Sequence, residues 1–210
     1  MQTKYINYIF KKLSDDHPKP RTELKYVNHF TFLISVILSA QATDVSVNKV
    51  TKNLFELVET PKEMIILGEK KLKNQIRSIG LFNSKAKNII ALSRILIEKY
   101  NSIVPKKFDD LIALPGVGNK TASVLQNVVF ALPRIAVDTH VFRVANRTGI
   151  VRAKTTDLTQ LYLEKTVPKK WLLKAHNLLI FHGRYVCKSK SPLCNKCSIF
   201  KFCEYKGKLN

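Results

Sequence analysis

The chain of 210 residues carries 36 lysines and arginines against 15 aspartates and glutamates, a formal net charge of +21. Hydrophobic residues make up 45% of it, which is ordinary for a globular protein and excludes a largely disordered one. So large a positive charge favours a polyanionic partner, nucleic acid before an acidic membrane surface. Lysines outnumber arginines by 28 to 8 along the whole chain, a pattern that AT-rich coding also produces.

The first residues lead into an amphipathic helix rather than an apolar segment with a cleavage site, which predicts that there is no signal peptide. The most apolar run, residues 30–40, is too short to span a bilayer and is interrupted by hydroxyl side chains. We therefore expect a cytoplasmic protein with no membrane partner. Disulfides are rare in that compartment, so its cysteines need another explanation.

Helical periodicity dominates the sequence, and no segment shows the alternation typical of a strand. Prolines, glycines and capping residues divide the pattern into about ten helices, which predicts an all-α fold. In chain order we expect them at about residues 5–13, 29–40, 44–57, 61–79, 83–100, 105–114, 120–129, 138–148, from 156 onward, and 168–182.

Three boundary signals are specific. Asp44 can cap the third helix, and residues 60–63, Thr-Pro-Lys-Glu, combine a capping box with proline at the first helical position. Gly80 predicts the end of the fourth helix. The sequence contains no repeat, low-complexity segment or flexible linker, so any division into lobes must arise from packing.

Residues 114–120 read Leu-Pro-Gly-Val-Gly-Asn-Lys. Pro115 ends the preceding helix, Gly116 and Gly118 allow a tight turn with close backbone approach, and Lys120 opens the next helix. The free N–H groups of such a turn and the N-terminus of a helix suit a phosphate. The pattern therefore indicates a hairpin between two helices, with a lysine where a phosphate would arrive.

This hairpin has three interpretations. A phosphate-binding loop of an NTPase is disfavoured, because Asn119 separates the glycine from the lysine, the glycine spacing is wrong and no strand precedes it. An ordinary turn with a surface lysine is the simplest interpretation for the hairpin alone. A helix-hairpin-helix that grips a DNA backbone, at about residues 107–131, is favoured only when the rest of the chain supports it.

The cysteines all lie in the last 24 residues and have the spacing C-x6-C-x2-C-x5-C. Thiolates select zinc or an iron–sulfur cluster over harder ions. Zinc ribbons usually pair two C-x2-C knuckles, and only one such pair is present, so a cluster with four cysteine ligands is favoured over zinc and over unligated thiols. The candidate ligands are Cys187, Cys194, Cys197 and Cys203.

Lys188 and Lys190 lie between the first two cysteines, where Pro192 stiffens the loop. A loop that is closed by metal ligands and carries lysines is rigid and positively charged, which suits contact with phosphate. Simple solvation of these two lysines is an equally good interpretation.

A third motif, Val-Asp-Thr-His-Val, occupies residues 137–141. Together with the hairpin and the cysteine spacing it makes the chain resemble, over essentially its whole length, the endonuclease III family of the helix-hairpin-helix superfamily. The related adenine glycosylases share the cysteine spacing, but they lack a lysine at the position of Lys120 and carry an extra C-terminal domain.

The resemblance implies a base-excision repair enzyme that acts as a monomer on double-stranded DNA with damaged bases or abasic sites, nucleoid-associated in a bacterium. Such an enzyme is a DNA glycosylase with AP lyase activity. It removes oxidised pyrimidines and cleaves the 3′ side of abasic sites by β-elimination through a lysine Schiff base.

The resemblance also implies two helical lobes flanking a cleft. Residues 21–132 would form a six-helix barrel that includes the helix-hairpin-helix. Residues 1–20 and 133–210 would form a discontinuous domain holding a 4Fe–4S cluster at 187–203, which is structural and contacts DNA rather than acting as a catalytic redox centre.

For catalysis, the resemblance assigns Lys120 as the nucleophile, which must be neutral to attack the sugar. Asp138 would accept protons and stabilise positive charge that develops on the sugar. Asp138 is also a good N-cap for a helix over 139–148, and both roles can hold at once. His140 is interpreted as a structural or DNA-proximal histidine rather than a general base.

For DNA binding, the resemblance assigns Leu81 as a wedge in the base stack and Gln41 as the side chain that fills the vacated space and contacts the orphaned base. A damaged base must leave the stack before its sugar can be reached, and an apolar side chain on a turn can replace the lost stacking. For Leu81 the alternative is a contact with the core at the end of a helix. Gly116 and Gly118 would let the hairpin backbone approach DNA.

Two other classes of protein compete with an enzyme. A non-catalytic DNA-binding protein could use the hairpin and the metal-stapled tail, but the presence of Lys120 together with Asp138 argues against it. An iron–sulfur electron carrier is disfavoured by the basic charge and by the large helical remainder of the chain.

Overall fold

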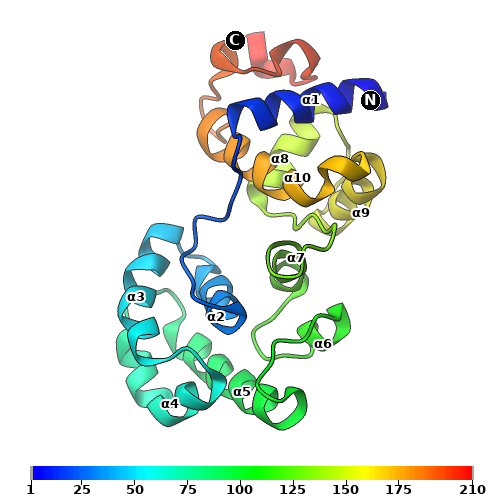
Figure 1. Ribbon diagram of the computed structural model, residues 1–210. Coiled ribbons are helices and arrows are strands. Elements are labelled where there is room, and N and C mark those ends of the chain that lie inside the picture. Colours follow the sequence, from blue (N-terminus) through cyan, green and yellow to red (C-terminus); the bar gives the residue numbers. More distant parts are fainter. Residues whose placement is uncertain (1, 210) are drawn as a thin grey trace. The chain divides into compact units, whose positions relative to one another are not determined.

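The computed structural model describes residues 2–209, and all the regular secondary structure in that range is helical, without a strand (Figure 1). This confirms the predicted all-α class. No helix in the described range is both long and apolar enough to cross a bilayer. The α-helices are α1 (Thr3–Asp16), α2 (His29–Ser39), α3 (Asp44–Leu57), α4 (Pro61–Gln75), α5 (Phe82–Tyr100), α6 (Phe108–Ile112), α7 (Asn119–Val128), α8 (Thr139–Thr148), α9 (Thr156–Thr166) and α10 (Lys169–Phe181).

Packing divides the chain into two compact units. Unit 1 joins Met1–Arg21 to Ala131–Asn210, and unit 2 is Thr22–Phe130. Unit 2 contains α2 to α7 and is built around α2, in which nine of eleven residues are buried. A helix that is apolar on all sides must lie inside a core, because no face of it suits water. The central position predicted for this helix is confirmed.

Unit 1 is completed by α1, the helix farthest away in the sequence. The apolar face of α1, which includes Phe10, is fully buried. The Phe10 ring stacks on Trp171 of α10 with a centroid separation of 6.2 Å, and Trp171 Nε1 donates to Asn7 Oδ1 at 3.1 Å. Figure 1 shows α1, in blue, lying across the yellow and orange helices of the C-terminal part. The N-terminal helix is therefore part of the C-terminal core.

The capping box at the start of α4 is confirmed, but the predictions from Asp44 and Gly80 are wrong, and the helix predicted at 105–114 is shorter, at Phe108–Ile112. Thr43, not Asp44, caps α3, since its hydroxyl accepts from Ser46 N at 3.2 Å and leaves Asp44 as the first helical residue. Helix α4 ends at Gln75 rather than near Gly80. Its interior is already broken at Gly68, where φ is +77°, and tight turns occupy the segment after it.

Candidate active site and metal centre

The hairpin joins the short helix α6 to α7 in unit 2. Gly116 has φ +81°, a backbone conformation that favours glycine, and a Cβ there would lie 3.1 Å from Asn88 Cβ, tighter than most real contacts. Gly118 has extended backbone and is the N-cap of α7. The first N–H groups of α7 have no acceptor within their own helix, which makes this end suitable for an anion. Lys120 is the second residue of α7 and its side chain is exposed.

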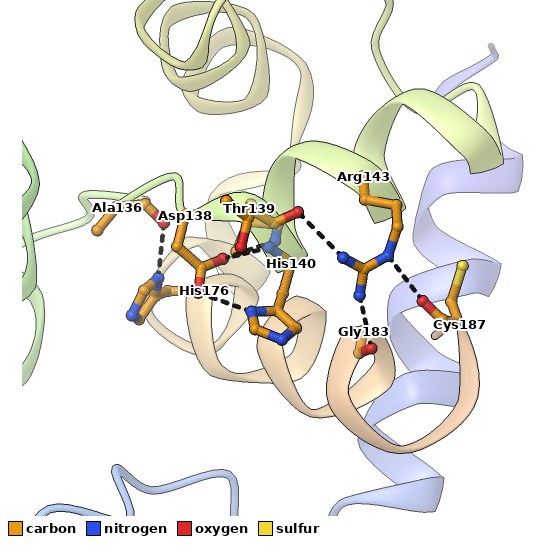
Figure 2. Close-up of polar contacts among 9 residues, drawn as sticks. Ala136, Asp138, Thr139, His140, Arg143, His176, Gly183 and Cys187 are labelled. Atoms are coloured by element: carbon orange, nitrogen blue, oxygen red, sulfur yellow. Dashed lines mark hydrogen bonds and ion pairs between the residues drawn. The ribbon is translucent and has the colours of Figure 1, made fainter. Parts of the chain in front are cut away.

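Asp138 is the N-cap of α8 in unit 1, as predicted. Its Oδ1 accepts from the backbone N–H of His140 at 2.9 Å and of Val141 at 2.8 Å. Its Oδ2 lies 3.1 Å from His140 Nδ1 (Figure 2). The Asp138 side chain is only 11% exposed. Three contacts therefore fix the direction of one carboxylate that still reaches the surface.

Two further contacts, from α10 and from a turn after it, hold the start of α8 in place. His176 Nδ1 lies 2.8 Å from the carbonyl oxygen of Ala136, two residues before Asp138. Gly183 belongs to a π-helical turn, η1 (His182–Val186), that packs on α8. A Cβ at Gly183 would lie 2.9 Å from His140 Cβ, closer than real contacts allow. Glycine is thus required for the close approach drawn in Figure 2.

Two arginines on α8 hold the loop that opens the cysteine segment. Arg143 donates through Nε to the Cys187 carbonyl at 2.9 Å and through a terminal nitrogen to the Gly183 carbonyl at 2.8 Å (Figure 2). Arg147 donates to the carbonyls of Lys188 at 2.7 Å and Ser189 at 3.0 Å. The helix that presents Asp138 is therefore bonded to the first cysteine loop. Sequence reasoning missed these arginines, although their spacing of four residues placed them on one helix face.

The four cysteines line one small cavity in unit 1. Burial raises the pKa of the Cys197 thiol to about 11 and raises that of Cys203 as well. Only thiolates ligate a metal, so binding at this site releases protons. Among residues 2–209 no group of three or more His, Cys, Asp or Glu side chains is arranged to bind a single metal ion. Four soft sulfur donors around one cavity fit an iron–sulfur cluster that takes one ligand from each.

A buried histidine, His182, completes the wall of this cavity. Its Nε2 lies 3.7 Å from Cys197 Sγ, and burial lowers the pKa of His182 to about 4, so its ring is neutral. The side chains of Lys188 and Lys190, by contrast, are exposed on the loop after Cys187. The Leu193 N–H donates to the Val186 carbonyl at 3.0 Å and closes this loop, while its lysines are exposed.

Gln41 and Leu81 lie on two turns of unit 2, after α2 and before α5. Both adopt the left-handed backbone region, with φ of 57° and 60°. Leu81 is 60% exposed, so the alternative that it packs on the core is wrong. A Cβ at Gly80 would lie 3.9 Å from the Gln41 carbonyl oxygen, so the two turns lie side by side.

The predicted site residues belong to both units. The hairpin with Lys120 belongs to unit 2, together with Gln41 and Leu81. Asp138 and the cysteine segment belong to unit 1.

Comparison with known proteins identifies the chain. Residues 34–169 match the model of the HhH-GPD superfamily base excision DNA repair proteins. Endonuclease III of Rickettsia prowazekii (strain Madrid E) is 54% identical over 205 residues, which cover 98% of this chain and 97% of that protein. The chain belongs to the endonuclease III family.

Two further relatives agree. Endonuclease III of Escherichia coli (strain K12) is 48% identical over 202 residues, which cover 96% of each chain. A solved structure of a trapped endonuclease III–DNA covalent intermediate, an estranged-adenine complex, superimposes with a TM-score of 0.93 at 43% identity over 100% of both chains. As an endonuclease III, the protein is a base-excision repair enzyme: a DNA glycosylase with AP lyase activity whose partner is DNA.

Proposed function

We propose that this enzyme excises oxidised pyrimidines from double-stranded DNA and then cleaves the 3′ side of the abasic site through a Schiff base on Lys120. The neutral amine attacks C1′, and the bond to the base breaks as the base leaves with its electron pair and takes up a proton. The attached nitrogen then loses a proton as the C1′–O4′ bond breaks, which opens the sugar ring, leaves O4′ as a hydroxyl and forms the imine. Loss of a C2′ proton from this imine expels the 3′ phosphate. Water then releases the sugar remnant and regenerates the amine.

The exposed position of Lys120 at the start of α7 is the observation that carries this proposal. A primary amine is the side chain that forms an imine with a sugar aldehyde carbon. The N–H groups at the same helix end suit a DNA phosphate, which would place the backbone of the damaged strand against the lysine. A related endonuclease III has been trapped as a covalent intermediate with DNA, the kind of species this mechanism requires.

Asp138 supplies the carboxylate of the proposed reaction. Two backbone N–H groups fix Oδ1, while Oδ2 lies 3.1 Å from His140 Nδ1. Such a carboxylate can accept a proton and can stabilise positive charge on the sugar as the base departs.

Leu81 and Gln41 would enter the duplex when the damaged base leaves it. Leu81 offers an exposed apolar side chain on a turn, which suits a gap between base pairs. Gln41 offers an amide with both donor and acceptor atoms, which suits the edge of the orphaned base. Their adjacent turns support a joint role.

We further propose that the four cysteines hold a 4Fe–4S cluster. The bound cluster would stabilise the conformation of the loops of residues 187–203 and would take no part in base removal. The exposed Lys188 and Lys190 on the first loop would then meet DNA phosphates, and the enzyme would act as a monomer.

The test is reductive trapping on a duplex with one abasic site. Borohydride reduces an imine to a stable amine, so the wild-type enzyme is expected to form a covalent adduct with DNA. Lys120→Gln keeps a polar side chain of similar size but lacks the amine, and should form no adduct while still binding the duplex. Lys99→Gln, at an exposed lysine of α5 in the same unit, is the matched control and should trap normally. Trapping that survives Lys120→Gln would overturn the assignment.

The proposed lesion class needs a separate measurement. A panel of duplexes, each with one oxidised pyrimidine, oxidised purine, alkylated purine or mismatch, should give excision only with the oxidised pyrimidines. Faster excision of another lesion class would contradict the proposed substrate while leaving the lysine chemistry intact.

A further inference from the structure

Lys85 is a buried lysine in the first turn of α5, with only 5% of the residue exposed. Its ammonium donates to the carbonyl oxygens of Leu38 at 2.8 Å and Ala40 at 2.6 Å. A charge is costly to bury, and burial lowers the pKa of Lys85 accordingly. A lysine is retained inside a core only where its charge meets fixed partners.

Those partners are the last carbonyls of α2. The C-terminal carbonyls of a helix lack acceptor bonds within it and carry the negative end of its dipole. Lys85 therefore caps α2 from another helix. The second of its acceptors, Ala40, is directly followed by Gln41, so the ammonium fixes the peptide from which the Gln41 turn departs.

The same residue also holds the turn of Leu81. The backbone N–H of Lys85 donates to the Leu81 carbonyl at 3.0 Å, the first hydrogen bond of α5. Lys85 thus contacts both turns, one through its side chain and one through its backbone. Non-glycine residues with positive φ persist only where the surrounding structure holds them, and two such residues, Gln41 and Leu81, lie on these turns.

We propose that Lys85 is a positioning residue that joins the Gln41 and Leu81 turns into one rigid unit for insertion into the DNA stack. The inference rests on the proposed roles of those two residues. Lys85 touches neither DNA nor the reacting sugar in this proposal. It sets the direction of the Gln41 turn relative to the Leu81 turn, so that both side chains enter one gap together.

The test uses Lys85→Met in the full chain and two substrates. Methionine fills a similar volume but cannot donate to the two carbonyls. On duplex DNA with one abasic site we expect kcat/KM to fall by about ten- to a hundredfold, because misplaced turns no longer fill the gap. On a single-stranded abasic oligonucleotide there is no stack to open, so the fall should stay below about twofold.

A fluorescence measurement reports insertion directly. 2-Aminopurine opposite the lesion is quenched while it is stacked and brightens when the stack opens. Wild-type enzyme should brighten it, and Lys85→Met should brighten it much less at saturating protein. Lys99→Met, which removes the same charge about 20 Å away along α5, is the matched control and should match wild type in both assays.

The outcomes separate three cases. Equal losses on duplex and single strand would mean that Lys85 serves only the fold, and unchanged duplex activity would mean that it has no role; either overturns the proposal. If Lys85→Met does not fold, Lys85→Gln, which keeps a donor, is judged by the same ratio of the two substrates. A wild-type enzyme that forms no borohydride adduct would instead contradict the proposed function itself.

Discussion

Asp138 is at once the N-cap of α8 and the proposed proton acceptor, and one substitution separates the two. Asparagine caps a helix about as well as aspartate, so Asp138→Asn should change the free energy of unfolding by less than about 1 kcal/mol. It removes the carboxylate, so single-turnover nicking should slow by about 10²–10⁴-fold while abasic DNA is still bound. Thermal unfolding, binding and nicking on one sample check all three expectations. Full activity would remove Asp138 from the mechanism.

At the residue scale, the sequence indicated those candidate site residues that lie within short contiguous motifs. The hairpin and the 137–141 motif pointed to Lys120 and Asp138, and the capping role of Asp138 follows from its place before a helix. Lys85 could not be found in this way. Its burial depends on α2, which lies 47 residues away at the Leu38 carbonyl, and a lysine in a helical pattern normally indicates a solvated face.

At the element scale, the close packing of η1 on α8 makes a prediction about Gly183. An added Cβ would meet His140 Cβ at 2.9 Å and the His140 carbonyl oxygen at 3.3 Å, and neither atom can move without the helix. Gly183→Ala should therefore destabilise the protein by about 1–3 kcal/mol and also slow nicking, because His140 contacts Asp138.

Gly118→Ala offers a comparison for that variant, since nothing lies within 4 Å of its added Cβ and its backbone is extended. Its free energy of unfolding should stay within about 1 kcal/mol of wild type. Denaturant unfolding distinguishes the two. Wild-type stability in Gly183→Ala would show that the turn and α8 separate easily.

The periodicity of the sequence predicted that these helices exist, but it did not predict where some of them end. Thr43 and Asp44 are both good caps, and only the structure decides which hydroxyl or carboxylate meets the N–H groups of α3. Gly80 has the residue type of a helix stop, yet α4 ends earlier, after a break at Gly68. Both errors arise because several local signals compete and tertiary packing selects one.

At the scale of the whole molecule, the chain passes into unit 2 at Thr22 and out of it after Phe130. Neither junction is rich in glycine or serine, so composition does not mark it. The return of α1 to the C-terminal core is equally hidden, since it depends on contacts such as Phe10 with Trp171, 161 positions apart in the numbering.

This division predicts where removal of iron should act. The cysteine segment packs on α1, because the Phe202 ring lies 5.4 Å from that of Tyr5 and 4.6 Å from that of Tyr8. Arg143 and Arg147 tie the same segment to α8. Loss of the proposed cluster should therefore loosen α1, α8 and residues 182–205 together, and should leave the separate core of unit 2 intact.

Hydrogen exchange on the intact chain, before and after oxidation and iron chelation, measures this. Amides of residues 182–205 should exchange about a hundredfold faster or more after iron removal, because loops without their ligand open with little free energy. Amides of α2 and α5 are the internal control and should keep their rates. Unchanged exchange in the cysteine segment would contradict a structural cluster, and equally raised exchange in α2 would contradict the independence of the two cores.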